Sequence, residues 1–112
     1  MRERAGRRAE TLACWWLRLH GWRIVARRLA LPQIEIDIVA VRGATLAFVE
    51  VKHRATIDAA VKALNAQALA RMLSAADAHG PALAARHGAR NFRCDMIATA
   101  PRSLPHHLAK LR

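Results

Sequence analysis

The chain has 112 residues, of which 54% are hydrophobic, and its formal net charge is +11 at pH 7. This length allows one domain with one core, and the apolar content excludes a largely disordered chain. No segment approaches the roughly 18 apolar residues of a membrane span, and charged residues interrupt the apolar run near the N-terminus. We expect a cytoplasmic protein without a membrane span. Its charge favours polyanionic partners such as DNA, RNA or an anionic surface.

Residues 2–20 are predicted to form a helix that ends at Gly21. The apolar residues that recur with helical spacing are Ala9, Leu12, Ala13, Trp16 and Leu17. Glu10 lies beside this stripe, where it either pairs with a nearby arginine or projects toward the edge of a sheet. We interpret Trp15, Trp16 and Trp22 as core residues, with stacking on nucleic-acid bases as the alternative.

An alternating pattern predicts a strand over residues 22–29, followed by a connection that contains Pro32. Residues 34–41 and 46–52 are then rich in β-branched and apolar side chains around a short break with a glycine. This pattern is typical of a β-hairpin. A type II′ turn at Gly43 and the next residue pairs residue 42 with residue 45 and fixes the register of the hairpin.

The predicted register places charged residues opposite each other in the hairpin. Asp37 lies opposite Glu50, and Glu35 lies opposite Lys52, all four on one face of the ribbon. The residues expected on the other face are Ile36, Ile38, Val49 and Val51. Two facing carboxylates repel, and a cation between them or a proton on one of them removes that repulsion. The hairpin is therefore predicted to be a site as well as a scaffold.

The second half of the chain is predicted to be mostly helical until a last strand. Thr56 suits the N-cap of a long helix that ends at Gly80-Pro81, and residues 82–87 form a shorter helix. Residues 91–98 alternate as a strand. Because this strand follows a long helical crossover, we expect it to run parallel to its neighbour.

These elements predict an α/β fold in which helices flank a mixed sheet with an antiparallel hairpin in its centre. Residues 1–100 are expected to form the single domain, and residues 101–112 a C-terminal tail that is frayed or weakly helical. Cys14 and Cys94 follow no metal-ligand spacing, so we interpret them as buried thiols in a reducing compartment.

The charged face of the hairpin suits phosphodiester chemistry. Asp37, Glu50 and the carbonyl of Val51 provide the oxygen ligands that Mg²⁺ or Mn²⁺ prefers, and Glu10 can add a third carboxylate. Lys52 can stabilise the negative charge of a phosphoryl transition state or orient the attacking water.

An ordinary salt-bridged face is the alternative to a metal site on the hairpin. In that case Glu35 pairs with Lys52, and Asp37 pairs with Arg54. Arg54 likewise contacts either a phosphate or a surface carboxylate.

Several motifs resemble the YraN-like family of small bacterial proteins. The segments that carry the resemblance are Gly6, Glu10, Ala13, Leu17 and Gly21, then residues 33–39 and 48–54, with residues 92–95 also fitting. The resemblance implies a restriction-endonuclease-like fold, similar to that of archaeal Holliday junction resolvases. It also implies that Asp37, Glu50 and Lys52 form a PD-(D/E)XK-type catalytic triad, with Glu10, Asp37 and Glu50 as metal ligands.

The resemblance further implies contacts with substrate from Glu35, Gln67 and Arg54. The sequence departs from the family pattern at Ile34, where the family has glycine, and in the long helix, where Gln67 lacks the usual preceding lysine. The leading hypothesis is a metal-dependent endonuclease-like protein that acts on DNA, including branched or damaged DNA. The similarity to the resolvases implies a homodimer. The alternatives are a non-catalytic nucleic-acid-binding module of the same fold and an interaction protein of a DNA-processing complex.

Overall fold

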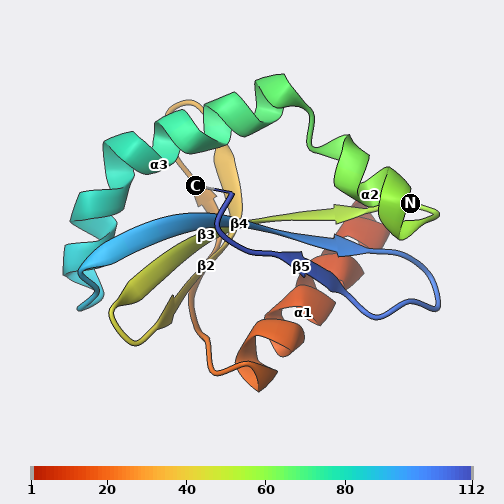
Figure 1. Cartoon of the computed structure of the whole chain (residues 1–112), viewed down its shortest axis with the longest axis horizontal. Helices are drawn as coiled ribbons and strands as arrows, with labels where there is room; N and C mark the ends of the chain where they lie inside the picture. The colour runs from red at the N-terminus through yellow and green to blue at the C-terminus, as the bar shows by residue number, and fades with distance from the viewer. Residues whose placement is uncertain (1, 112) are drawn as a thin grey trace.

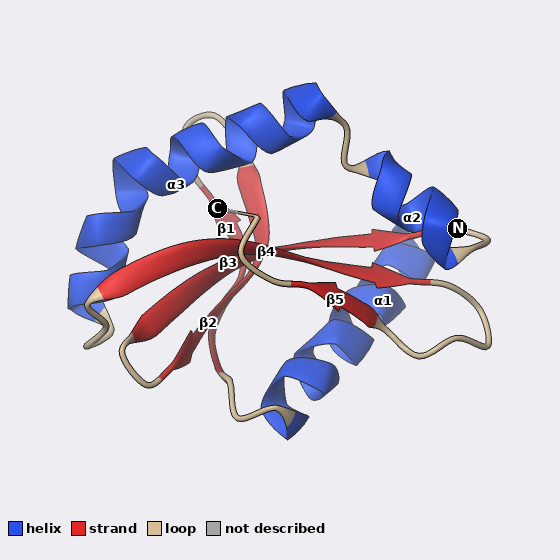
Figure 2. Cartoon of the chain, viewed as in Figure 1, coloured by secondary structure: helices blue, strands red, loops and turns tan. Residues whose placement is uncertain are grey.

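The computed structural model describes residues 2–111. The chain folds as a mixed α/β protein with three layers (Figures 1 and 2). The elements in chain order are α1 Arg2–Leu19, β1 Arg23–Ala30, β2 Glu35–Arg42, β3 Thr45–His53, α2 Ile57–Ala63, α3 Ala66–Arg86, β4 Asn91–Thr99 and β5 His106–Leu108. The strands form one sheet in the order β1-β2-β3-β4-β5, in which only the β3–β4 pair is parallel. None of the described helices is long and apolar enough to cross a membrane.

Each face of the sheet is covered by one long helix. Helix α1 packs Ala13, Cys14 and Leu17 against one face, where Ile38 and Val49 are fully buried. The opposite face carries Val39, Val41, Leu46, Phe48 and Cys94, which pack against Met72, Ala76 and Ala84 of α3. Figure 1 shows α1 and α3 on opposite sides of the strands. Cys14 and Cys94 are both buried free thiols, as predicted.

The turn end of the hairpin has the predicted register. Pairs run from Ile38 and Val49 to Arg42 and Thr45. Gly43 closes the turn with a φ of 58°, a left-handed value that a residue with a Cβ adopts only at a cost. The parallel pairing of β4 with β3 is also confirmed.

The tryptophans differ from one another in burial. Trp22 is buried in the α1 side of the core, as predicted. Trp15 lies on the outer face of α1 with 58% of its surface exposed, so the prediction of a core residue is wrong there. Trp15 directly precedes Trp16, which packs against the core, and two adjacent tryptophans do not reveal from sequence which ring faces the core.

The helices of the second half are divided at a different place from the predicted one. Thr56 is the N-cap, but α2 ends after Ala63, and Asn65 caps α3 by accepting a hydrogen bond from the Ala68 amide at 2.8 Å. Helix α3 then continues through Gly80 and Pro81 to Arg86. Tertiary packing on the sheet thus outweighs the local tendency of proline to end a helix.

Gly80 is required by a close approach between α3 and β4. A Cβ built at this residue would lie 2.7 Å from ring atoms of Phe92, and the Phe92 ring packs edge-to-face on Phe48 at 6.2 Å. We expect Gly80→Ala to destabilise the protein by about 1–3 kcal/mol because the ring must move, even though alanine favours a helix. Urea unfolding checks this prediction.

Gly6→Ala is the matched control, since Gly6 is also helical and has no atom near the position of an added Cβ. It is expected to stabilise α1 by up to about 1 kcal/mol. Equal stabilisation by both substitutions would contradict a packing role for Gly80.

The C-terminal segment differs from the expected frayed tail. Residues 106–108 form β5, an antiparallel edge strand on β4, and Leu111 packs against the core. Asp95 of β4 anchors this segment, and its side chain is completely buried. The Asp95 carboxylate accepts hydrogen bonds from His107 Nε2 at 2.7 Å and from the Lys110 amide at 3.0 Å. Arg93 adds an ion pair at 3.0 Å. The last residues described are thus part of the domain.

Candidate functional site

The site lies where the hairpin opens. The ladder between β2 and β3 stops at Ile38 and Val49, whereas β3 stays paired with β4 as far as His53. Beyond Ile38 the Asp37 carboxylate takes over a bond of the ladder, because its Oδ2 accepts the hydrogen of the Val51 amide at 2.8 Å. The divergence opens a cleft of about 440 Å³. Its lining residues are Gly6, Ala9, Glu10, Asp37, Glu50, Val51, Lys52, His53 and Arg54.

Asp37 and Glu50 face each other across this opening, although they are not paired in the ladder as the simple register predicted. Burial raises the pKa of Glu50 to about 8, and the hydrogen bond and negative charge of Asp37 act in the same direction. Lys52 partly opposes this rise in pKa. The pair is therefore unfavourable as two free carboxylates and calls for a proton or a cation between them.

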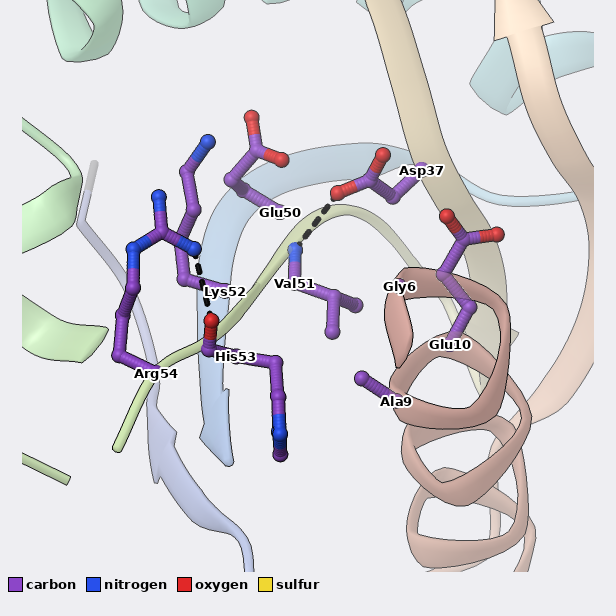
Figure 3. A pocket seen from close by; sticks show the side chains of 9 residues that line it. All are labelled: Gly6, Ala9, Glu10, Asp37, Glu50, Val51, Lys52, His53 and Arg54. Atoms are coloured by element: carbon purple, nitrogen blue, oxygen red, sulfur yellow. Dashed lines mark hydrogen bonds between the residues drawn. The ribbon is translucent and has the colours of Figure 1, made fainter. Parts of the chain in front are cut away.

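Lys52 and Arg54 supply positive charge on the β3 side of the cleft. Figure 3 shows both side chains on the far side of Glu50 from Asp37. Arg54 is exposed, and its guanidinium donates a hydrogen bond to the His53 carbonyl at 2.7 Å. The His53 ring is fixed by a 2.8 Å hydrogen bond to the Thr99 hydroxyl. An anionic group in this cleft would meet the two cations next to the two acids.

Glu10 reaches the same cleft from α1, as the resemblance implied, and it also pairs with arginine. Its Oε1 accepts a hydrogen bond from Arg28 Nε at 3.1 Å, and Arg27 lies 3.8 Å away. In Figure 3 its carboxylate lies beyond that of Asp37, as seen from Glu50. Both interpretations of Glu10 thus hold in part: it lines the cleft, and arginines from β1 hold it.

Several hairpin predictions need correction. Ile36 does not share a cluster with Ile38; it packs with Val39 and Val41 on the α3 side, beyond the last pair of the β2–β3 ladder. The alternative interpretation of the hairpin required salt bridges of Glu35 with Lys52 and of Asp37 with Arg54, and neither forms among the residues described. The ordinary salt-bridged face therefore does not explain these charges.

Two of the residues implied to contact substrate lie outside the cleft. Glu35 is exposed at the start of β2 and pairs with Ala30 of β1. Gln67 is exposed in the first turn of α3. Only Arg54 of that group lines the cleft.

The carboxylates of Asp37 and Glu50 fit a divalent cation. They are part-buried and adjacent, and burial together with the hydrogen bond and charge of Asp37 raises the pKa of Glu50, a rise that a bound cation would oppose. Mg²⁺ is commonly held by one or two carboxylates while it keeps several waters. Among the side chains that the structure describes, no three of His, Cys, Asp or Glu converge as metal ligands, so the fit rests on these two acids.

Arg28 and Thr99 are parts of the site that the sequence did not reveal. Arg28 has a φ of 53°, and the pairing of β1 with β2 shifts between Ile24 and Ala26, a bulge that no local motif announces. Thr99 is buried at the end of β4 and is far from His53 in sequence. Only the alternation of β4 could have suggested that a polar residue at its end lies next to β3.

The fold and cleft together define a small mixed α/β protein whose open hairpin carries two facing carboxylates and a lysine. The chain belongs to the Uncharacterised protein family UPF0102, whose model matches residues 9–99. This finding confirms the membership that the hairpin motifs indicated.

Relatives in this family match over nearly the whole chain. A UPF0102 protein from Sphingopyxis alaskensis is 47% identical over 106 residues, which cover 95% of this chain and 90% of the relative. One from Rhizorhabdus wittichii is 43% identical over 109 residues, covering 97% and 91%. One from Caulobacter sp. strain K31 is 46% identical over 106 residues, covering 93% of this chain and 74% of the relative.

Proposed function

We propose that this protein is a metal-dependent endonuclease of restriction-endonuclease-like fold that hydrolyses phosphodiester bonds in DNA. The observation that carries the proposal is the meeting of Asp37, Glu50 and Lys52 in one cleft where the hairpin opens. The formal charge of +11 supports a polyanionic substrate. The two buried free thiols suit a reducing, cytoplasmic compartment.

Asp37 and Glu50 would hold Mg²⁺ or Mn²⁺ in the cleft. When bound, such an ion polarises a phosphate oxygen and lowers the pKa of water. The Val51 amide fixes one oxygen of Asp37 and so holds that carboxylate in place before any ligand arrives. This preorganisation avoids the cost of ordering the side chain during binding.

Lys52 and Arg54 act on the phosphate itself. The Lys52 ammonium neutralises negative charge that grows on the phosphoryl oxygens in the transition state. Arg54 is exposed at the rim, where it can bind a neighbouring phosphate and align the strand. Glu10 stays paired with Arg28 and helps to position the N-terminal half of α1.

Cleavage of DNA in Mg²⁺ or Mn²⁺ tests the proposed function. Asp37→Ala and Lys52→Ala are each expected to lower the rate roughly 100-fold or more, as when an electrostatic group of an active site is removed. Glu35→Ala is the matched control, because Glu35 is an exposed acid of the same strand outside the cleft. Cleavage that is unchanged in both cleft variants would overturn the proposal.

A non-catalytic nucleic-acid-binding module is the second candidate, and the state of Glu10 favours it. The third acid is held by Arg28 and does not join the other two in a three-ligand cluster within the described chain. This candidate predicts salt-sensitive DNA binding that survives Glu50→Ala, with no cleavage in any divalent metal. Metal-dependent cleavage that is lost in Asp37→Ala would exclude it.

A further inference from the structure

Trp15 is a large aromatic side chain exposed beside the basic surface of α1. Its surface is 58% exposed, and Leu12 on the preceding turn is 43% exposed. The Arg18 guanidinium lies 5.4 Å from the centroid of the ring. Arg8, Leu12 and Trp15 are spaced by four and three residues, so they share one face of the helix.

Two further hollows connect the carboxylate cleft to Trp15. The first, of about 370 Å³, shares Ala9 and His53 with the cleft and continues to Arg102 in the loop after β4. The second, of about 450 Å³, shares Arg8 and Leu12 with the first and ends at Trp15. The three depressions therefore form one path along α1, from Gly6 to Trp15.

The lining of this path is basic and apolar. Arginines contribute from α1 and from the loop after β4, and none of the described residues that line the two hollows is a carboxylate. A nucleic acid matches both features, because its phosphates can pair with the arginines and its bases can stack on an exposed aromatic ring. The charge thus favours a nucleic acid over a protein as the occupant.

We propose that the two hollows bind single-stranded nucleic acid, with one unpaired base stacked on the Trp15 ring and phosphates near Arg8 and Arg102. From Arg8 to Trp15 the helix rises about 10 Å, which matches about three nucleotides of a stacked strand. Bases in an intact duplex are stacked on each other and cannot cover the ring. The inference rests on the proposed function in that it gives the cleft its substrate class: DNA with a single-stranded segment.

Binding of a short fluorescent oligodeoxythymidine in EDTA tests this inference, because EDTA prevents metal-dependent cleavage. Trp15→Ala and Trp15→Leu are expected to weaken binding roughly 10-fold, and Trp15→Phe less, because base stacking needs an aromatic face. The same Trp15 substitutions should change binding to a duplex of equal length less than about 2-fold, because stacked bases do not cover the ring. Arg8→Ala should reduce the slope of log affinity against log salt by about 0.7.

Leu19→Ala is the matched control, since Leu19 is a 79% exposed apolar residue of the same helix and does not line either hollow. It should bind the strand as the wild type does. Wild-type affinity in Trp15→Leu would overturn the inference. A change of sedimentation in Trp15→Leu with unchanged strand binding would also overturn it, by assigning the surface to a protein contact.

The same variants separate this inference from the proposed function. If Trp15→Leu loses strand binding while Asp37→Ala cleaves as the wild type does, the single-strand site is supported and the proposed catalytic cleft is refuted. If cleavage depends on Asp37 but strand binding does not depend on Trp15, the endonuclease proposal is supported and the single-strand site is refuted. Circular dichroism of each variant at the assay temperature shows whether it is folded.

Discussion

Asp95→Ala is expected to lower the free energy of unfolding at pH 7 by about 3 kcal/mol, because removal of one member of a buried ion pair leaves its partners uncompensated. Asp95 is completely buried, and His107, Arg93 and the Lys110 amide all contact its carboxylate. Without it, β5 loses its anchor on β4. Urea unfolding measures the loss of stability, and hydrogen exchange of the β5 amides measures the loss of their protection.

The pKa of Asp95 gives the pH dependence of this contribution. Burial alone would raise that pKa, but the hydrogen bonds from His107 and Lys110 and the charge of Arg93 lower it below the ordinary 3.8. A carboxyl group with a lowered pKa stabilises the fold above its unfolded value and loses this contribution as the pH falls through its folded value. The gap between wild type and Asp95→Asn should therefore close only below about pH 4.

Asp58→Ala is the matched control for the Asp95 variants. Asp58 forms a 3.0 Å ion pair with Lys62 on the surface of α2, and its side chain is 78% exposed. Its loss should cost less than about 0.5 kcal/mol. A similar small cost for Asp95→Ala would show that the buried cluster does not hold the C-terminal segment.

Glu50→Gln is expected to stabilise the metal-free protein at pH 8 by about 4 kcal/mol, at roughly 1.4 kcal/mol for each unit of pKa shift. Burial and the adjacent Asp37 raise the pKa of Glu50 to about 8, well above its ordinary 4.5. The folded state then holds a proton that the unfolded state has released. Stability conferred by this proton is complete below about pH 4.5, falls as the pH rises, and is lost above about pH 8.

Unfolding in EDTA between pH 4.5 and 8 checks the Glu50 prediction. The wild type should lose stability over this range, Glu50→Gln should lose less, and added Mg²⁺ should restore the wild type because the ion binds only the folded pair. Glu35→Gln, at an exposed glutamate outside the cleft, should follow the wild type. Parallel curves for the wild type and Glu50→Gln would contradict strain between the two carboxylates.

The sequence predicted the hairpin because its register is local. A glycine at the turn and alternating apolar residues specify the pairing from Arg42 back to Ile38 without reference to the rest of the chain. Past Ile38 the prediction fails in detail, since β2 stays with β1 while β3 stays with β4, and the sheet opens. The cleft exists because of this competition between strands, which no local pattern contains.

Elements that depend on distant contacts were the ones that differed. The break before α3 lies at Asn65, while Gly80 and Pro81 remain helical because the glycine lets α3 approach Phe92. Strand β5 has a short polar sequence and forms because Asp95 is buried beneath it. Burial of a charged residue is decided by its partners, and these lie too far along the chain for periodicity to show.

Binding of Mn²⁺ by calorimetry tests the central claim most directly, because it asks whether the facing carboxylates form a cation site apart from any turnover. The wild type should bind the ion, and Asp37→Asn and Glu50→Gln should each weaken binding at least roughly 10-fold, the range seen when ligands or their immediate supports are removed. Lys52→Ala should bind at least as tightly as the wild type, because a nearby positive charge is gone. Equal binding by the wild type, Asp37→Asn and Glu50→Gln, or no binding by the wild type, would contradict the claim.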